Sequence, residues 1–347
     1  GNVALDVSRV LAKHVEDMLV TEIPENVAKG LAENPVTDVH VFGRRGPAQV
    51  KFTPLELREL GHVPDVDIIV SEDDFDSEEA LRASNQQRQV VKTLTNYAME
   101  DPESHTASRR IHIHLFQSPV EILADEDGNV SAIRTERTEL TGDGSVRGTG
   151  VITTWPVQAA YRAIGYYSSP VPGLPFDKRA GVVPNVEGRV IDSDTTQDPN
   201  APVVQGVYAT GWIRRGPVGL IGSTKSDAQQ TISHLVEDAE AGRLHATSSE
   251  VGHEAMVALL RERGVEFTTW EGWELLDAYE AALGEKYGEL PGGRGVRERI
   301  KVVSRRAMTD VSLGKDQVHE DLIGQMGEMG VPSAPERFED YSGPSRI

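Results

Sequence analysis

The chain begins with GNVALDVSRVL (residues 1–11), a stretch that is typical of the second half of a glycine-rich turn leading into a helix. A Rossmann dinucleotide site requires a strand, then G-x-G-x-x-G/A, then a helix whose N-terminal amides bind a pyrophosphate. Gly1 takes the place of the second glycine, and Ala4 stands where the third small residue belongs. Because the first glycine and the preceding strand are missing, we expect the chain to be a fragment. The alternative is an ordinary amphipathic helix that starts with Gly-Asn.

A strand pattern followed by two arginines strengthens the dinucleotide interpretation. Residues 39–42 alternate as a strand does and lead into Gly43-Arg44-Arg45-Gly46. At the end of the second strand of such a fold, an acidic residue binds the 2′-hydroxyl of NAD, whereas arginine accommodates the 2′-phosphate of NADP. Arg44 and Arg45 therefore favour NADP. The alternative for the two arginines is a solvated turn with two surface cations. The separation between Gly1 and the end of this strand also exceeds the usual ~20 residues, so the NADP interpretation requires a helix–loop extension over residues 23–35.

Several blocks of the chain resemble the adrenodoxin-reductase-like ferredoxin–NADP⁺ reductases. Residues 1–11 and VFGRRGPAQVKFTPLELREL (residues 41–60) resemble the NADP domain of that family. ATGWIRRGPVGLIGSTKSDAQQTI (residues 209–232) resembles its late flavin-contacting segment, and residues 173–190 resemble the return to the flavin domain. The resemblance ends near Leu313. The family also has an N-terminal flavin-binding half, which the blocks above do not include.

This resemblance implies an α/β fold with a Rossmann-like NADP-binding domain and the C-terminal part of a Rossmann-like FAD-binding domain. The expected domains are residues 1–170 for NADP and residues 171–314 for FAD, with an extension at 315–347 that is partly disordered. The implied activity is electron transfer from NADPH through FAD to a ferredoxin-type iron–sulfur protein. FAD and NADP are the implied cofactors.

Two carboxylates match family residues close to the nicotinamide, namely Asp6 and Glu56. Each also has a structural interpretation. Asp6 suits the first turn of a helix, where a negative charge stabilises the helix dipole. Glu56 completes Thr53-Pro54-Leu55-Glu56, which is a capping box with proline at the first helical position. The two roles of Glu56 need not exclude each other.

The remaining candidate residues divide among the cofactors and the partner. By resemblance, backbone amides of Gly1, Asn2 and Val3 bind the pyrophosphate of NADP, while Trp212, Gly219, Leu220 and Ile221 contact FAD, with Gly219 also near NADP. The alternative for Trp212 is a place in the core. Arg88 and Lys92 are four residues apart on an expected helix and could bind the iron–sulfur protein. The alternative for this pair is a solvated helix face.

His112 and His114 alternate with Ile111 and Ile113 on an expected strand, so the two imidazoles share one face. A pair of histidines is a possible metal site, but no third ligand is evident in the sequence. We therefore expect no metal here and two solvent-facing side chains.

Composition narrows the class of protein. The 347 residues carry a formal net charge of -20, which opposes nucleic-acid binding and long-range attraction of an acidic ferredoxin. The absence of cysteine rules out thiol catalysis and cysteine-ligated clusters within this chain. It also suits a cytoplasmic protein, and no apolar run approaches the length of a membrane span.

Two rival interpretations remain. One is another NADP-dependent oxidoreductase with two dinucleotide folds, such as a relative of the glutamate-synthase small subunit, although such subunits usually carry cysteine-ligated clusters. The other is a catalytically incomplete nucleotide-binding remnant.

The coarse pattern predicts alternating helices and strands. The expected helices cover residues 3–19, 78–99, 227–239, 254–263 and 273–283, with a short one from Pro54. Beyond residues 39–42, the expected strands cover residues 110–117 and 207–213 and a hairpin of residues 120–124 and 130–134 with an Asp-Gly turn.

Overall fold

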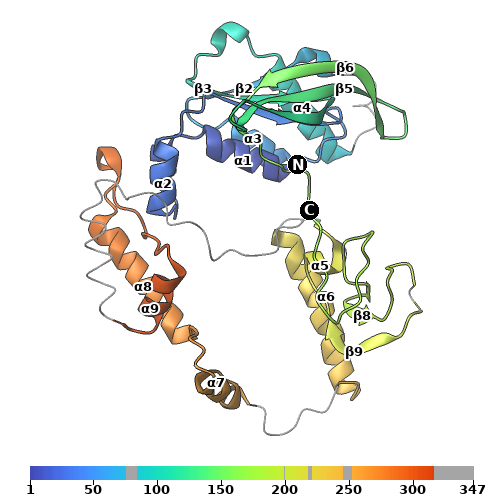
Figure 1. Ribbon diagram of the computed structural model, residues 1–347, viewed down its shortest axis with the longest axis vertical. Helices are drawn as coiled ribbons and strands as arrows, with labels where there is room; N and C mark the ends of the chain where they lie inside the picture. The colour runs from blue at the N-terminus through green and yellow to red at the C-terminus, as the bar shows by residue number, and fades with distance from the viewer. Residues whose placement is uncertain (76–83, 199, 218–220, 245–251, 316–347) are drawn as a thin grey trace. The chain divides into compact units, whose positions relative to one another are not determined.

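The computed structural model describes residues 1–75, 84–198, 200–217, 221–244 and 252–315 (Figure 1). The α-helices are α1 (Asn2–Ala12), α2 (Glu25–Ala32), α3 (Pro54–Leu60), α4 (Asn85–Ala98), α5 (Trp212–Arg215), α6 (Ile221–Glu240), α7 (His253–Glu262), α8 (Trp270–Tyr287) and α9 (Arg305–Ser312). The strands are β1 (Asp38–Phe42), β2 (Val66–Val70), β3 (Arg109–His114), β4 (Gln117–Ala124), β5 (Val130–Leu140), β6 (Val146–Pro156), β7 (Asn185–Val186), β8 (Arg189–Ile191) and β9 (Val203–Tyr208).

These elements form two compact units, which are described separately. Unit 1 consists of Gly1–Ala4, Gln49–Thr53 and Phe116–Val257. Unit 2 consists of Leu5–Ala48, Pro54–Leu115 and Ala258–Ile347.

Unit 2 contains a parallel sheet of strand order β1-β3-β2. The central strand β3 buries Ile111 and Ile113, as expected for a strand covered on its apolar face. Helix α4 connects β2 with β3 and packs against α3 and β2 (Figure 1). It begins with a capping box between Ser84 and Gln87 and buries Val90 and Leu94. The parallel sheet with its crossover helix confirms the predicted α/β class.

Helix α1 is shorter than predicted, because it ends at Ala12 rather than continuing to residue 19. Side chains from elsewhere in unit 2 bind its last carbonyl groups. Asn34 Nδ2 donates to the Leu11 carbonyl at 3.0 Å, and Arg109 Nη1 donates to the Lys13 carbonyl at 2.9 Å. These bonds satisfy the acceptors that a helix leaves unpaired at its C-terminus. The apolar periodicity of the sequence carries no sign of partners that lie so far along the chain.

A backbone turn divides the strand predicted over residues 110–117. Strand β3 ends at His114, Phe116 has a φ of 52°, and β4 begins at Gln117. A positive φ is rare for a large side chain and cannot continue an extended strand. The predicted hairpin with its Asp-Gly turn is confirmed, and β6 adds a third antiparallel strand, giving the order β4-β5-β6.

The rest of unit 1 is a small antiparallel sheet, β7-β8-β9, with helix α6 alongside β8 and β9 (Figure 1). Its core includes Val183, Val190 and Ala209. The strand predicted over residues 207–213 is wrong in its second half, since β9 ends at Tyr208 and α5 begins at Trp212. Gly211 between them has a φ of 75°, which turns the chain out of the strand.

The C-terminal helices of unit 2 form a separate cluster. Helices α8 and α9 lie side by side (Figure 1) and bury Tyr279, Leu283 and Val311 with Ile300 and Val302. None of the helices within the described ranges combines the length and the apolar character that a membrane span needs.

Candidate functional site

The start of α1 leaves backbone amides available for an anion. Its first turn contains no acidic residue, and the first N–H groups of any helix lack partners within the helix. Asn2 connects this end to Thr53 through two hydrogen bonds: its Nδ2 donates to Thr53 Oγ1 at 3.2 Å, and its Oδ1 accepts from the Thr53 N–H at 2.9 Å. These two hydrogen bonds form only when the chain is folded, because Asn2 and Thr53 are 51 positions apart in the sequence.

The same pair alters the interpretation of Glu56. In a capping box, Glu56 would accept the Thr53 N–H, but that group donates to Asn2 instead. Proline does stand at the first position of α3, as predicted.

Asp6 and Glu56 both lie beside the guanidinium of Arg9. Arg9 Nη2 is 2.6 Å from Asp6 Oδ1 and 3.6 Å from Glu56 Oε2, while Nη1 donates to Glu59 Oε2 at 2.6 Å. The first-turn interpretation of Asp6 is wrong, because Asp6 lies in the second turn and pairs with Arg9 three residues on. The structure therefore brings the two predicted carboxylates together around an arginine that sequence reasoning had missed. The i, i+3 spacing of Asp6 and Arg9 was the available signal.

Arg44 and Arg45 follow the carboxyl end of β1. The Gly43 N–H donates to the His114 carbonyl of β3 at 2.8 Å, so the turn starts while still attached to the sheet. Arg44 is exposed and Arg45 is half-buried. In the part of the chain that the structure describes, no carboxylate forms an ion pair with Arg45. An anion approaching this end of the sheet therefore meets two cations and no competing acid from the turn itself.

The predicted flavin segment begins with an exposed tryptophan. Trp212 is 44% exposed, which contradicts the alternative of a core position, and its ring lies 5.6 Å from that of Tyr166. Gly219 and Leu220 lie outside the described residues, and Ile221 is the first residue of α6.

Asp227 of α6 holds the turn between β9 and α5 in place. Its carboxylate accepts hydrogen bonds from the Gly211 N–H, from Thr210 Oγ1 at 2.9 Å and from Arg214 Nη1 at 3.0 Å. Sequence reasoning missed this residue, because its partners precede it by 13 to 17 positions and only the fold brings them together. Burial opposes ionisation of Asp227, but the hydrogen bonds from Gly211 and Thr210 and the charges of Arg214 and Arg215 outweigh it and lower the pKa.

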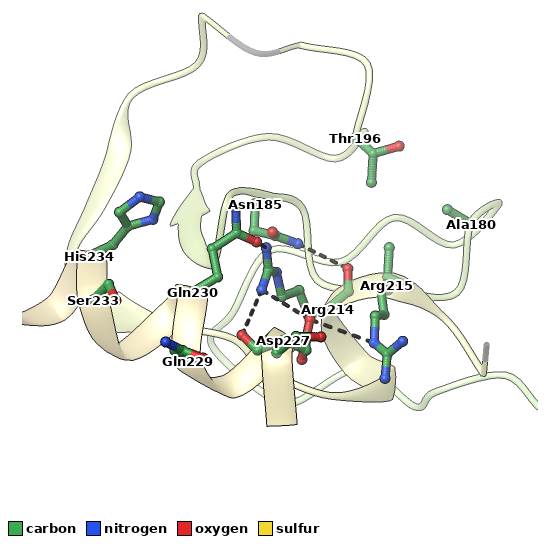
Figure 2. A pocket seen from close by; sticks show the side chains of 12 residues that line it. Ala180, Asn185, Thr196, Arg214, Arg215, Asp227, Gln229, Gln230, Ser233 and His234 are labelled. Carbon is green, nitrogen blue, oxygen red and sulfur yellow. Dashed lines mark hydrogen bonds and ion pairs between the residues drawn. The ribbon is translucent and has the colours of Figure 1, made fainter. Parts of the chain in front are cut away.

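An open cavity of about 980 Å³ lies beside this turn (Figure 2). Arg214 and Asp227 contribute to its wall together with polar side chains of α6 such as Gln230. Arg215 also lines the cavity, and its Nε lies 3.6 Å from Asp227 Oδ1 in an ion pair. Its buried Nε and Nη2 atoms have no hydrogen-bond acceptor among the described residues. A buried donor without an acceptor is costly, so Arg215 is suited to an anionic ligand.

Arg88 and Lys92 lie on the exposed face of α4, opposite the buried Val90 and Leu94. Their i, i+4 spacing places the two charges next to each other, as predicted. His112 and His114, in contrast, are half-buried on β3, so the expectation of two solvent-facing histidines is wrong. His40 of the neighbouring strand β1 lies beside them.

Comparison with known proteins supports the pattern of blocks found in the sequence. The chain is 35% identical over 324 residues to the NADPH-ferredoxin reductase FprA of Mycobacterium tuberculosis, covering 90% of this chain and 66% of the relative. It is 34% identical over 296 residues to the mitochondrial NADPH:adrenodoxin oxidoreductase of Arabidopsis thaliana, covering 82% of this chain and 60% of the relative. No protein-family profile matches the chain.

The fold agrees with the sequence comparison. The structure of Mycobacterium tuberculosis FprA in complex with NADPH matches with a TM-score of 0.74 and 34% identity, covering 90% of this chain and 66% of that one. The chain spans 59% to 66% of the length of the curated relatives compared here. Sequence and fold together show that the chain belongs to the adrenodoxin-reductase-like ferredoxin–NADP⁺ reductase family.

Proposed function

We propose that the chain is the NADP-binding and flavin-contacting part of a reductase that passes electrons from NADPH through FAD to a ferredoxin-type iron–sulfur protein. The observation that carries this proposal is the turn of residues 43–46 at the carboxyl end of β1. It presents Arg44 and Arg45 where a dinucleotide fold meets the adenine ribose, and it contains no acidic residue. The relatives named above support the same activity.

Each part of NADP has candidate partners in this proposal. The backbone amides of Gly1, Asn2 and Val3 would hold the pyrophosphate, and Arg44 and Arg45 would bind the 2′-phosphate. Asp6 and Glu56 would shape the nicotinamide pocket, with Arg9 fixing the position of both carboxylates.

For FAD, the candidate residues are Trp212 and the segment from Gly219 through Leu220 to Ile221, with Gly219 also near NADP. The exposed Trp212 ring and Arg215, whose buried Nη2 has no hydrogen-bond acceptor among the described residues, fit a large, partly anionic aromatic cofactor. Transfer of hydride and of single electrons is the chemistry of the nicotinamide and the flavin, which the protein positions. In this scheme residues 1–170 bind NADP, residues 171–314 belong to the FAD domain, and residues 315–347 are an extension.

The preference for NADPH over NADH tests the assignment of Arg44 and Arg45 to the 2′-phosphate. We expect Arg44→Ala with Arg45→Ala to weaken NADPH binding by roughly 10- to 100-fold, the value of one or two charge-assisted hydrogen bonds. NADH, which lacks the 2′-phosphate, should lose less than about threefold. Fluorescence titration of both nucleotides measures this, with the exposed Arg261→Ala on α7 as the control variant. Equal losses for NADPH and NADH would contradict the assignment.

The absorption spectrum of the purified chain tests the flavin part of the proposal. Flavin bands that survive desalting would support a cofactor site held by this chain. A colourless chain that still selects NADPH would retain the nucleotide site and contradict stable flavin binding by these residues alone.

The proposed partner, a ferredoxin-type iron–sulfur protein, would bind at Arg88 and Lys92, since two adjacent exposed cations suit an acidic surface. The absence of cysteine favours a reducing compartment, and we propose the cytoplasm.

A further inference from the structure

Three histidines gather on one face of the parallel sheet in unit 2. His40 comes from β1, and His112 and His114 come from β3. The register places His40 directly opposite His112. His112 and His114 are two residues apart and therefore share a face, whereas Ile111 and Ile113 are buried on the other.

The three imidazoles lie close enough together to share one ion. One potential ligand atom from each lies within 4.8 Å of the others. His40 Nδ1 is 2.9 Å from His114 Nε2, and the His40 and His112 rings are stacked with centroids 4.5 Å apart. Zinc–nitrogen bonds of 2.0–2.1 Å place the ligand atoms of a tetrahedral site about 3.4 Å apart. The three rings lie nearly parallel, with interplanar angles of 2° to 14°, so binding one ion requires rotation about χ2, a torsion that is broad for histidine.

The surroundings of the cluster shift the titration of two of its three imidazoles. Burial lowers the pKa of His114 to about 3, with the neighbouring imidazoles of His40 and His112 adding to the effect. Burial likewise lowers the pKa of His40, helped by His112 and Arg110 and partly opposed by Asp38.

Asp38 supplies the outer support that metal-binding histidines usually have. Its Oδ1 is 2.8 Å from His112 Nε2, which leaves Nδ1 of that ring for an ion. Arg110 also binds Asp38, at 2.8 Å between Nε and Oδ1. Partial burial opposes ionisation of Asp38, but hydrogen bonds from His112, Thr37 and Arg110 outweigh it and lower its pKa to about 2. Asp38 therefore pairs with Arg110, whose positive charge would otherwise oppose a cation at the cluster.

We propose that His40, His112 and His114 form a binding site for a divalent transition-metal ion of the zinc class, with Asp38 orienting His112. Three imidazole nitrogens suit Zn²⁺, Co²⁺, Ni²⁺ or Cu²⁺ rather than Mg²⁺ or Ca²⁺, which prefer oxygen ligands. A water molecule would complete the coordination of a three-histidine site. This proposal is independent of the proposed reductase function.

Metal titration of the full chain tests the proposal. Calorimetry with ZnCl₂ should give one ion per chain, and CoCl₂ should produce the visible absorption of tetrahedral cobalt. We expect His114→Gln and His40→Gln each to weaken Zn²⁺ binding at least about 100-fold, while the exposed His62→Gln binds as the wild type does. Mg²⁺ at the same concentration should give no binding heat.

Two results would overturn the site. One is less than about a fifth of an equivalent of Zn²⁺ on the wild-type chain. The other is equal affinity in the wild type and in both cluster variants. Should those variants fail to fold, X-ray absorption of the zinc-loaded wild type decides. A shell with imidazole scattering from three histidines supports the proposal, and a shell of oxygen atoms contradicts it.

Discussion

At the scale of single residues, Arg9 is central to the arrangement of the predicted catalytic carboxylates. It contacts Asp6 on its own helix and both Glu56 and Glu59 on α3. A planar guanidinium holds its donors in a rigid fork and can bind several carboxylates at defined angles, whereas an ammonium group is a point charge on a flexible stem. Three carboxylates around one cation also mean that removal of the cation leaves unbalanced negative charge. Arg9 is therefore a positioning residue for Asp6 and Glu56.

We expect Arg9→Met to lower the free energy of unfolding by about 1 kcal/mol, since the side chain is 29% exposed and solvent screens the pairs. Arg9→Lys should recover less than half of this loss. Urea denaturation measures the loss of stability, with Arg58→Met on α3 as a control, because Arg58 is exposed and its side chain binds only the Pro54 carbonyl in the described part of the chain. Equal stabilities of the Arg9→Met and Arg58→Met variants would show that the Arg9 contacts contribute nothing.

At the scale of elements, Asp238 joins α6 to β8 and β9. Its carboxylate binds Arg189 of β8 through two bonds of 2.8 and 2.9 Å, and it also accepts from Tyr208 of β9 and from Arg243. Hydrogen bonds from Arg189 and Tyr208 are the main cause of the lowered pKa of Asp238. One buried carboxylate of a long helix thus binds two strands of a sheet that has only three short ones.

This attachment predicts a specific pH dependence. The folded pKa of Asp238 lies below the unfolded value of about 3.9. The stabilisation is therefore complete above about pH 4 and is lost as the pH falls through the folded pKa. We expect Asp238→Asn to melt at a lower temperature than the wild type at pH 7, with the difference shrinking below pH 4.

Thermal unfolding followed by circular dichroism from pH 7 to pH 2 measures this difference. Asp198→Asn serves as the control, because Asp198 is exposed and, among the described residues, its carboxylate accepts only from the Asn200 N–H. A difference between wild type and Asp238→Asn that stays constant over this range would contradict the role of the ionised carboxylate.

At the scale of the whole molecule, a net charge of -20 opposes the approach of an acidic iron–sulfur protein. The proposed docking at Arg88 and Lys92 must then act at short range, where local charges outweigh the distant field. Both residues are on the exposed face of α4, whose other face is anchored by Leu94, 0% exposed. A docking helix fixed in this way presents its charges without a loss of backbone entropy.

We expect Arg88→Glu with Lys92→Glu to weaken binding of an acidic [2Fe–2S] ferredoxin about tenfold at low ionic strength, with the difference narrowing at 0.5 M NaCl. Calorimetry with the purified ferredoxin measures the affinity. Lys286→Glu with Arg305→Glu makes the same change of net charge on exposed positions of α8 and α9. Equal weakening by both double variants would indicate an effect of net charge rather than of the α4 surface.

The sequence by itself determined the class of fold and the order of its functional blocks. Local patterns were sufficient where the cause was local: the alternation of residues 39–42, the Asp-Gly turn of the β4–β5 hairpin and the proline at the start of α3 all stand as predicted. The family resemblance rested on short blocks of sequence as well, namely residues 1–11, 41–60, 173–190 and 209–232, and the comparisons confirm it.

Only the tertiary structure decided which of these residues meet. Arg109 binds a carbonyl group at the end of α1, almost one hundred positions earlier in the chain. Asp227 accepts a hydrogen bond from the turn that precedes it, and Arg9 joins Asp6 to Glu56. His40 completes the histidine cluster because the parallel strands β1 and β3 align residues that are 72 positions apart in the chain. Periodicity describes one segment at a time, whereas hydrogen bonds and ion pairs form between whichever segments the packed core brings within reach.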